Sequence, residues 1–112
     1  MGQPRARKSL RSLDEQLRFA ITNKRLIGLK YDGVLRIGEP HDYGMRLGIP
    51  RLLFYQLQRA NGNYRWTAAV GWKELWLSKI EECIVSPQTF PGSRGSSHQQ
   101  HLSWDELFAR VT

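Results

Sequence analysis

The sequence has little cysteine and no long apolar run. Cys83 is the one cysteine among 112 residues, so an intramolecular disulfide cannot form, and small secreted domains usually contain several. The longest apolar runs, such as residues 52–55 and 68–70, are far shorter than the roughly 20 residues that cross a membrane. Residues 1–10 are basic and lack the apolar stretch of a signal peptide. We therefore expect a cytoplasmic protein without a membrane partner.

The sequence also lacks the residue patterns of common catalytic and metal sites. His41 and Asp42 are adjacent, but no convincing serine or cysteine lies nearby to serve as the nucleophile of a hydrolytic site. The spacing of His98 and His101 suits two metal ligands on a helix, yet no cysteine accompanies them and the next acidic residue is Asp105. No glycine motif of a phosphate-binding loop occurs. We therefore expect a protein that is not an enzyme and that binds no metal or cofactor.

Positive charge is abundant, with 17 Lys and Arg against 10 Asp and Glu and a net charge of +7. Clustered cations favour polyanionic partners, because phosphates release their counterions when cations bind them. The first four cations precede every acidic residue; they are Arg5, Arg7, Lys8 and Arg11. Two interpretations of this segment stay open, a solvated basic tail that aids solubility and an arm that binds nucleic acid.

Length and composition predict one folded domain with short appendages. Hydrophobic residues make up 40% of the chain and charged residues 24%, close to the averages of soluble globular proteins, so the middle of the chain should fold around one core. We divide the chain into a basic disordered tail (1–11), a β-barrel domain with an N-terminal helix (12–90), a Gly/Ser/Gln-rich linker (91–101) and a short C-terminal helix (102–112).

Capping signals predict both helices. Ser12 and Glu15 have the spacing of a capping box, and the apolar residues that follow fall on one helical face until about Asn23. Ser103 and Glu106 repeat this spacing near the C-terminus, where flanking leucines suit a hydrophobic staple.

The clearest strand signal is a hairpin. Residues 26–31 and 34–39 flank Asp32-Gly33, a pair that readily adopts the positive φ values of a two-residue turn. Residues 41–50 contain two glycines and a proline and follow neither the helical nor the strand period, which predicts a long loop.

The remaining strand signals are shorter. Residues 52–59 read as a strand with both faces substantially buried. Residues 64–70 fit either a strand or a tryptophan-bearing loop, and two short strands at 72–77 and 83–86 flank a polar turn at 78–82. One helix followed by about five short antiparallel strands predicts a mostly β fold, a small SH3-like or Sm-like antiparallel barrel.

The order of several short motifs resembles the WYL domain family. The motifs are Ala20-Ile21 at the helix end, Leu26-Ile27-Gly28-Leu29-Lys30-Tyr31, Arg36-Ile37-Gly38-Glu39-Pro40, Phe54-Tyr55-Gln56, and Lys73-Glu74-Leu75-Trp76-Leu77-Ser78-Lys79-Ile80. Phe54-Tyr55-Gln56 stands where the family has Trp-Tyr-Leu, and lysine stands at two positions where the family has arginine. The resemblance covers roughly residues 17–90.

The resemblance implies an SH3-like or Sm-like barrel that binds a small phosphorylated ligand or single-stranded nucleic acid in bacterial transcriptional regulation. Most family members attach this barrel to a helix-turn-helix domain, for which the residues before the first predicted strand are too few. We therefore expect a stand-alone barrel, or one whose DNA-binding domain is supplied by a protein partner.

Six residues are candidates for ligand or nucleic-acid binding. The resemblance implies Arg36, Tyr55, Lys73 and Lys79. The predicted loop adds His41, and Arg51 directly follows it, because binding groups often lie on loops. Cations contact phosphates and a tyrosine ring stacks on a base, although lysine lacks the planar fork of arginine. The alternative is structural, with Tyr55 in the core and the cations on solvated strands.

Two functions follow from these residues. The first is a non-enzymatic regulatory module whose basic, aromatic-lined barrel face accepts a phosphorylated ligand or a single strand. The second is a protein-interaction adaptor that uses the barrel surface or the C-terminal helix, with Trp104, Leu107 and Phe108 as apolar anchors. The first is favoured if Arg36 and Lys73 share one concave surface with Lys79. The second is favoured if these cations scatter and an apolar patch appears instead.

Overall fold

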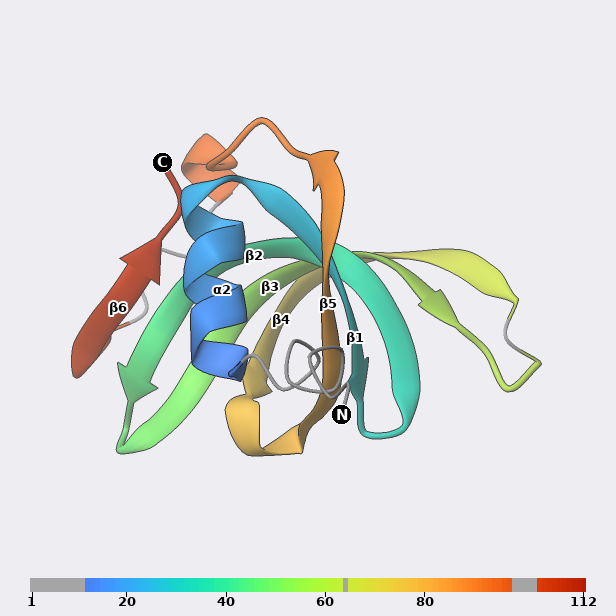
Figure 1. The fold of residues 1–112 in the computed structure, drawn as a ribbon, viewed down its shortest axis with the longest axis horizontal. Coiled ribbons are helices and arrows are strands. Elements are labelled where there is room, and N and C mark those ends of the chain that lie inside the picture. Colours follow the sequence, from blue (N-terminus) through green and yellow to red (C-terminus); the bar gives the residue numbers. More distant parts are fainter. Residues whose placement is uncertain (1–11, 64, 98–102) are drawn as a thin grey trace, which may run out of the picture.

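A computed structural model describes residues 12–63, 65–97 and 103–112 (Figure 1). The chain order is α2 (Leu13–Thr22), β1 (Arg25–Tyr31), β2 (Val34–Arg46), β3 (Ile49–Ala60), β4 (Trp66–Trp76), η1 (Leu77–Lys79), β5 (Ile80–Thr89), η2 (Gly95–Ser97) and β6 (Glu106–Arg110). The mostly β prediction is therefore confirmed. The predicted basic tail, residues 1–11, lies outside the described residues.

Helix α2 forms where the capping signal predicts it. The Ser12 hydroxyl accepts a hydrogen bond from the backbone N–H of Glu15, and the Glu15 carboxylate accepts one from the N–H of Ser12. These two bonds satisfy donors that the first helical turn leaves without partners. The apolar face of the helix buries Leu17, Ala20 and Ile21.

The β1–β2 hairpin is also confirmed. Tyr31 pairs with Val34 across the turn, and Asp32 (φ 53°) and Gly33 (φ 76°) both have positive φ values. This is the conformation of a two-residue turn whose twist matches that of the strands it joins.

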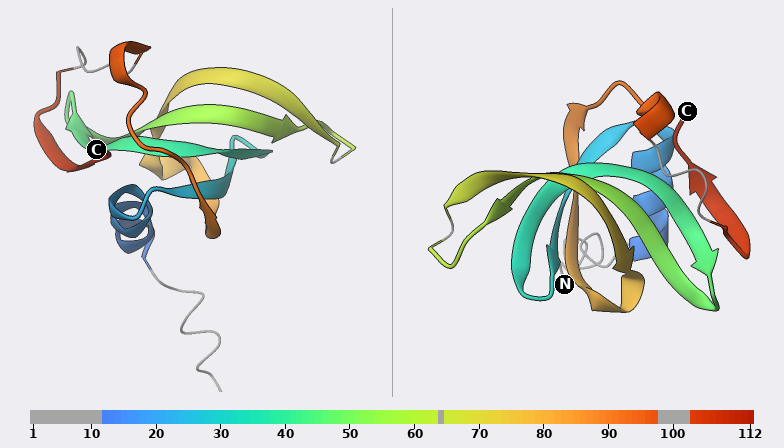
Figure 2. Two further views of the ribbon diagram at one scale, coloured as in Figure 1. Left: turned by 90° about the horizontal axis from the view of Figure 1, so that it is seen from above. Right: turned by 180° about the vertical axis from the view of Figure 1, so that it is seen from behind.

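The strands form one antiparallel sheet in the order β4-β3-β2-β1-β5, and β6 pairs with the far half of β2. The sheet is strongly curved, and α2 lies on its concave side (Figure 2). Strands β4 and β5 end this order at opposite edges without pairing with each other in the described residues, so the sheet is open. The β3–β4 hairpin extends away from the rest of the molecule (Figure 1).

The concave face changes character along its length. Under α2 it is apolar, where Leu17 and Ile21 of the helix belong to one core cluster with Ile27, Phe54 and other strand residues. Helix α2 contacts β1, β2, β5 and β6. The part of the concave face on β3 and β4 that α2 does not cover is available for other groups.

The long loop predicted at 41–50 is wrong, because β2 continues to Arg46. A register shift near Pro40 accommodates the missing N–H of proline within the strand. Beyond it, Asp42 and Tyr43 are buried and pair with both β3 and β6. Strand β2 then turns into β3 at Leu47-Gly48, where both residues have positive φ.

The C-terminal helix predicted at 102–112 is also wrong, because residues 106–110 form strand β6. The capping spacing is a local signal, and the ladder with β2 outweighs it. The Asp105 N–H donates to the carbonyl oxygen of Met45 at 2.7 Å, and its carboxylate accepts from the N–H of Gly48 at 2.8 Å. Phe108 packs against the Tyr43 ring, so the helical adaptor surface does not form.

Two bidentate ion pairs fasten the C-terminal segments to β2. Arg94 contacts both carboxylate oxygens of Glu39 at 2.9 and 2.8 Å, and Arg110 contacts both of Asp42 at 3.1 and 3.0 Å. Both carboxylates are buried. The segment at 90–97 is therefore bonded to the sheet, although composition alone predicted a linker there.

The segment at 64–70, for which the sequence allows a strand or a loop, belongs to β4 from Trp66 onward. The predicted polar turn at 78–82 covers the last two residues of η1 and the start of β5. In the described part of the chain, no helix has the length and apolar character needed to span a membrane.

Candidate anion-binding site

Strand pairing brings three cations to one part of the concave face. Arg36 on β2 lies opposite Arg59 on β3, and Lys73 on β4 lies opposite the core residue Phe54. Side chains of directly paired residues project from the same face of a sheet, so Lys73 shares the face of Phe54. The cations therefore lie beyond the apolar core on the same face.

These cations surround a hollow of about 510 Å³, which we call the basic hollow. It is lined by Arg36, Gln56, Arg59, Ala69, Val70 and Lys73. None of these lining residues is acidic. No carboxylate in the lining balances these cations, which makes the basic hollow a candidate anion-binding site.

Gln56 lines the basic hollow and fixes the position of Arg36. Its side chain is buried, donates to the carbonyl oxygen of Ala69 at 2.6 Å and accepts from Nη1 of Arg36 at 2.8 Å. Because the amide is bonded at both ends, Arg36 is anchored through one nitrogen. The remaining donors of its guanidinium are directed by this anchor.

The charged form of Arg36 is disfavoured by its surroundings. Its Nε atom is buried and makes no hydrogen bond within the described part of the chain. Burial first, and then the nearby charge of Arg59, lower the pKa of the Arg36 guanidinium. Both causes disfavour the charged form, while the charge of Asp32 acts less strongly in the opposite direction. An anion bound in the hollow would favour the charged form.

The other predicted site residues lie elsewhere. The Tyr55 ring contacts the Trp72 ring, with centroids 4.9 Å apart, and lies 3.7 Å from the guanidinium carbon of Arg94. His41 is fully buried, and its Nε2 lies 2.8 Å from a Glu39 oxygen. The structure therefore places both residues in the contacts that hold the C-terminal segment to the sheet.

Arg51 and Lys79 both make cation–π contacts with the Trp76 ring. The guanidinium carbon of Arg51 and the ammonium nitrogen of Lys79 each lie 5.5 Å from the centre of that ring. Arg51 also donates to the carbonyl oxygen of Arg46 and contacts Glu74. Of the six predicted residues, the structure brings Arg36 and Lys73 together in the basic hollow and places the other four outside its lining.

Sequence reasoning missed Arg59 and Gln56. A usable signal was present, because between Tyr43 and Lys73 the chain has no Asp or Glu. The charged residues in this stretch are Arg46, Arg51, Arg59, Arg65 and Lys73. The one-sided charge of this stretch points to a basic surface on β3 and β4 without any knowledge of the register.

A second, smaller hollow of about 340 Å³ lies beside the buried ion pair and is lined by Glu39, Pro91, Gly92, Ser93, Arg94 and Ser97. Both Glu39 oxygens are already engaged by Arg94, and one also by His41. These ion pairs and hydrogen bonds join the 91–97 segment to β2, and they leave the Glu39 carboxylate with little capacity to bind a ligand.

Among the described residues, no group of three or more His, Cys, Asp or Glu side chains is placed to hold a metal ion. His98 and His101, considered above as metal ligands, lie outside the described residues. Comparison of the chain with family models, with curated proteins and with solved structures found no match.

Cys83 should react slowly with thiol reagents. Burial raises the pKa of its thiol to about 12 from an ordinary value of 9.0, so the reactive thiolate at pH 8 is about 1000-fold rarer than in the unfolded chain. A thiolate of higher pKa is also more nucleophilic, so we expect Ellman's reagent to modify the folded protein at least about tenfold more slowly than the urea-unfolded protein. Similar rates in the two states would contradict the burial of the thiol.

Proposed function

We propose that this chain is a non-enzymatic binding module that holds a phosphate-bearing ligand in the basic hollow. The observation that carries the proposal is the convergence of Arg36, Arg59 and Lys73 around one concavity whose lining has no acidic residue. Fixed cations in a concave site attract and retain phosphates more strongly than scattered surface cations do.

Each side chain has a distinct role in this proposal. Arg36, anchored by Gln56, presents directed N–H donors to phosphate oxygens. Arg59 and Lys73 are exposed and supply charge from the neighbouring strands. The basic hollow contains no nucleophile with a paired base, which supports binding in preference to catalysis.

The curved sheet supports a further proposal about its family. An N-terminal helix precedes four strands that each pair with the next, and β5 returns to pair with β1. We propose that this sheet is an open variant of the SH3-like or Sm-like barrel of WYL domains. In this proposal the chain is a cytoplasmic regulatory module that acts alone or with a partner that supplies a DNA-binding domain.

Titration with labelled oligonucleotides tests the proposed site. We expect a single-stranded oligonucleotide to bind in fluorescence anisotropy, and Arg59→Ala and Lys73→Ala each to weaken binding about tenfold, as expected for loss of one charged hydrogen bond. Competition with a nucleoside monophosphate separates the two sources of phosphate. A small-ligand site releases the probe at low monophosphate concentration, whereas a nucleic-acid site does not.

Lys79→Ala is the matched control, since it removes a lysine that lies over Trp76, outside the lining of the basic hollow. It should bind within about twofold of the parent, with only the general loss of one cation. Equal losses in Lys73→Ala and Lys79→Ala would show that binding follows net charge, and the proposed site would be wrong.

A further inference from the structure

Gly28 lies on β1, between β2 and the edge strand β5. It pairs with Ile37 on β2 and with Ile84 on β5, so one row of residues crosses three strands. Its neighbours Ile27 and Leu29 are buried in the core. Because successive residues of a strand face opposite sides, Gly28 faces away from the core.

The packing of the chain itself does not require glycine at this position. A Cβ atom at Gly38 would clash with the carbonyl oxygen of Tyr55, and one at Gly44 with the carbonyl oxygen of Glu106. A Cβ at Gly28 would meet nothing closer than a carbonyl oxygen 3.9 Å away. Glycine inside a strand weakens it, and it often marks a place that a ligand approaches closely.

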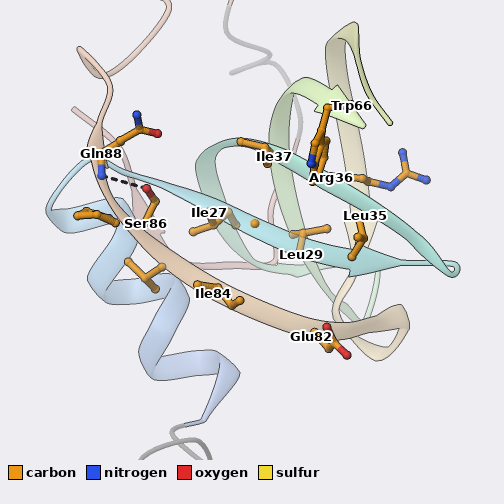
Figure 3. Close-up of a pocket in the computed structure, with 13 residues that line it drawn as sticks. Ile27, Leu29, Leu35, Arg36, Ile37, Trp66, Glu82, Ile84, Ser86 and Gln88 are labelled. Carbon is orange, nitrogen blue, oxygen red and sulfur yellow. Dashed lines mark hydrogen bonds between the residues drawn. The ribbon is translucent and has the colours of Figure 1, made fainter. Parts of the chain in front are cut away.

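The missing side chain leaves an apolar trough of about 400 Å³, which we call the Gly28 trough (Figure 3). Ile37 and Trp66 line one side and Ile84 lines the other. The Ile84 side chain is 70% exposed and that of Trp66 is 42% exposed. Covering such exposed apolar side chains with a ligand removes apolar surface from water, which favours binding.

Polar groups lie at both ends of the trough, with Ser86 and Gln88 at one end and Glu82 at the other (Figure 3). Ser86 and Gln88 are among its lining residues, and the Ser86 hydroxyl accepts a hydrogen bond from the backbone N–H of Gln88. That hydroxyl retains its own proton for donation. A trough with apolar sides and a few polar groups at its ends is typical of sites for small organic molecules.

We propose that the Gly28 trough binds a small, flat, uncharged organic molecule that is mostly apolar and has a hydrogen-bond acceptor near Ser86. Its volume falls within the roughly 300–1000 Å³ of small-molecule pockets. A stable protein interface needs about 800 Å² from each partner, far more than the few exposed apolar side chains at this place provide. The site is separate from the basic hollow, although Arg36 contributes to both linings.

The test uses N-phenyl-1-naphthylamine, a neutral aromatic probe that fluoresces in apolar surroundings. We expect the parent protein to bind the probe saturably and Gly28→Val to weaken binding at least tenfold, because the new side chain projects into the trough where the probe would lie. Valine favours strands and meets no close atom here, so this variant should be as stable as the parent. Ile84→Ser removes one side of the trough at an exposed position and should also weaken binding.

Gly62→Val makes the same chemical change at a glycine with open space around it, and probe binding should be unchanged. Lys73→Ala should also leave probe binding unchanged, because the probe is uncharged, so failure of this site and failure of the basic hollow are distinguishable. Absence of saturable binding by the parent, or equal binding by Gly28→Val and the parent, would overturn the proposal.

Discussion

Asp42→Ala is expected to lower the free energy of unfolding by about 3 kcal/mol, the lower end of what loss of one partner from a buried ion pair costs. Asp42 has no exposed surface and binds Arg110 through both carboxylate oxygens. Its removal leaves the Arg110 guanidinium without this partner and opens a gap between β2 and β6. Because Arg110 is about one third exposed, water can hydrate it in part, which keeps the loss at the lower end.

Urea unfolding followed by circular dichroism measures this effect. Glu106→Ala is a suitable control, since it removes an exposed carboxylate from the same strand pair and should change stability by less than about 0.5 kcal/mol. If Asp42→Ala and Glu106→Ala unfold at the same urea concentration, the ion pair does not fasten β6.

Gly38→Val is expected to have a comparable or larger effect, for a steric reason. A Cβ at this position would overlap the carbonyl oxygen of Tyr55 and lie 2.6 Å from Cζ of Phe54. Phe54 is fully buried, so its ring cannot move aside without disturbing the core. Overpacking of this kind costs about 3 kcal/mol or more, and the midpoint of thermal unfolding should fall by about 10–20 °C.

Gly28→Val is the matched control for this experiment. Gly28 and Gly38 lie on the paired strands β1 and β2, and the substitution is the same, but a Cβ at Gly28 makes only an ordinary contact of 3.9 Å with the carbonyl oxygen of Arg36. A thermal midpoint that falls equally in both variants would mean that strand propensity, and not the contact with Phe54, decides the result.

The elements predicted correctly from sequence are those whose signals are local. Ser12 and Glu15 are three residues apart and specify the start of α2, and Asp32-Gly33 specifies the first hairpin turn. In these cases the residues that define the structure also satisfy its backbone requirements, so no distant contact is needed to predict it.

The errors come from contacts between distant segments. The sequence does not reveal the turn at Leu47-Gly48, because leucine rarely adopts the positive φ that the surrounding strand pairing maintains here. Residues 103–106 have a capping-box pattern, yet β2 offers a ladder that begins next to the 2.7 Å hydrogen bond from Asp105 to Met45. No periodicity within either segment reveals this pairing.

The sequence predicts only part of the candidate site, because the rest depends on contacts between distant segments. Arg36 and Lys73 were chosen by resemblance, and both line the basic hollow. Arg59 enters the lining because it pairs with Arg36, and Gln56 because it is bonded to both Arg36 and Ala69. These facts depend on a register with two irregularities between β2 and β3, which the alternation of residue types does not specify.

The most direct test of the basic hollow is a titration of ¹⁵N-labelled protein with inorganic phosphate, followed by amide chemical shifts. We expect saturable shifts that cluster at the amides of Arg36, Arg59, Ala69 and Lys73, and we expect Lys73→Ala to reduce them. Shifts confined to residues 1–11, or spread evenly over exposed cations, would contradict the proposal that these strands form a phosphate-binding site.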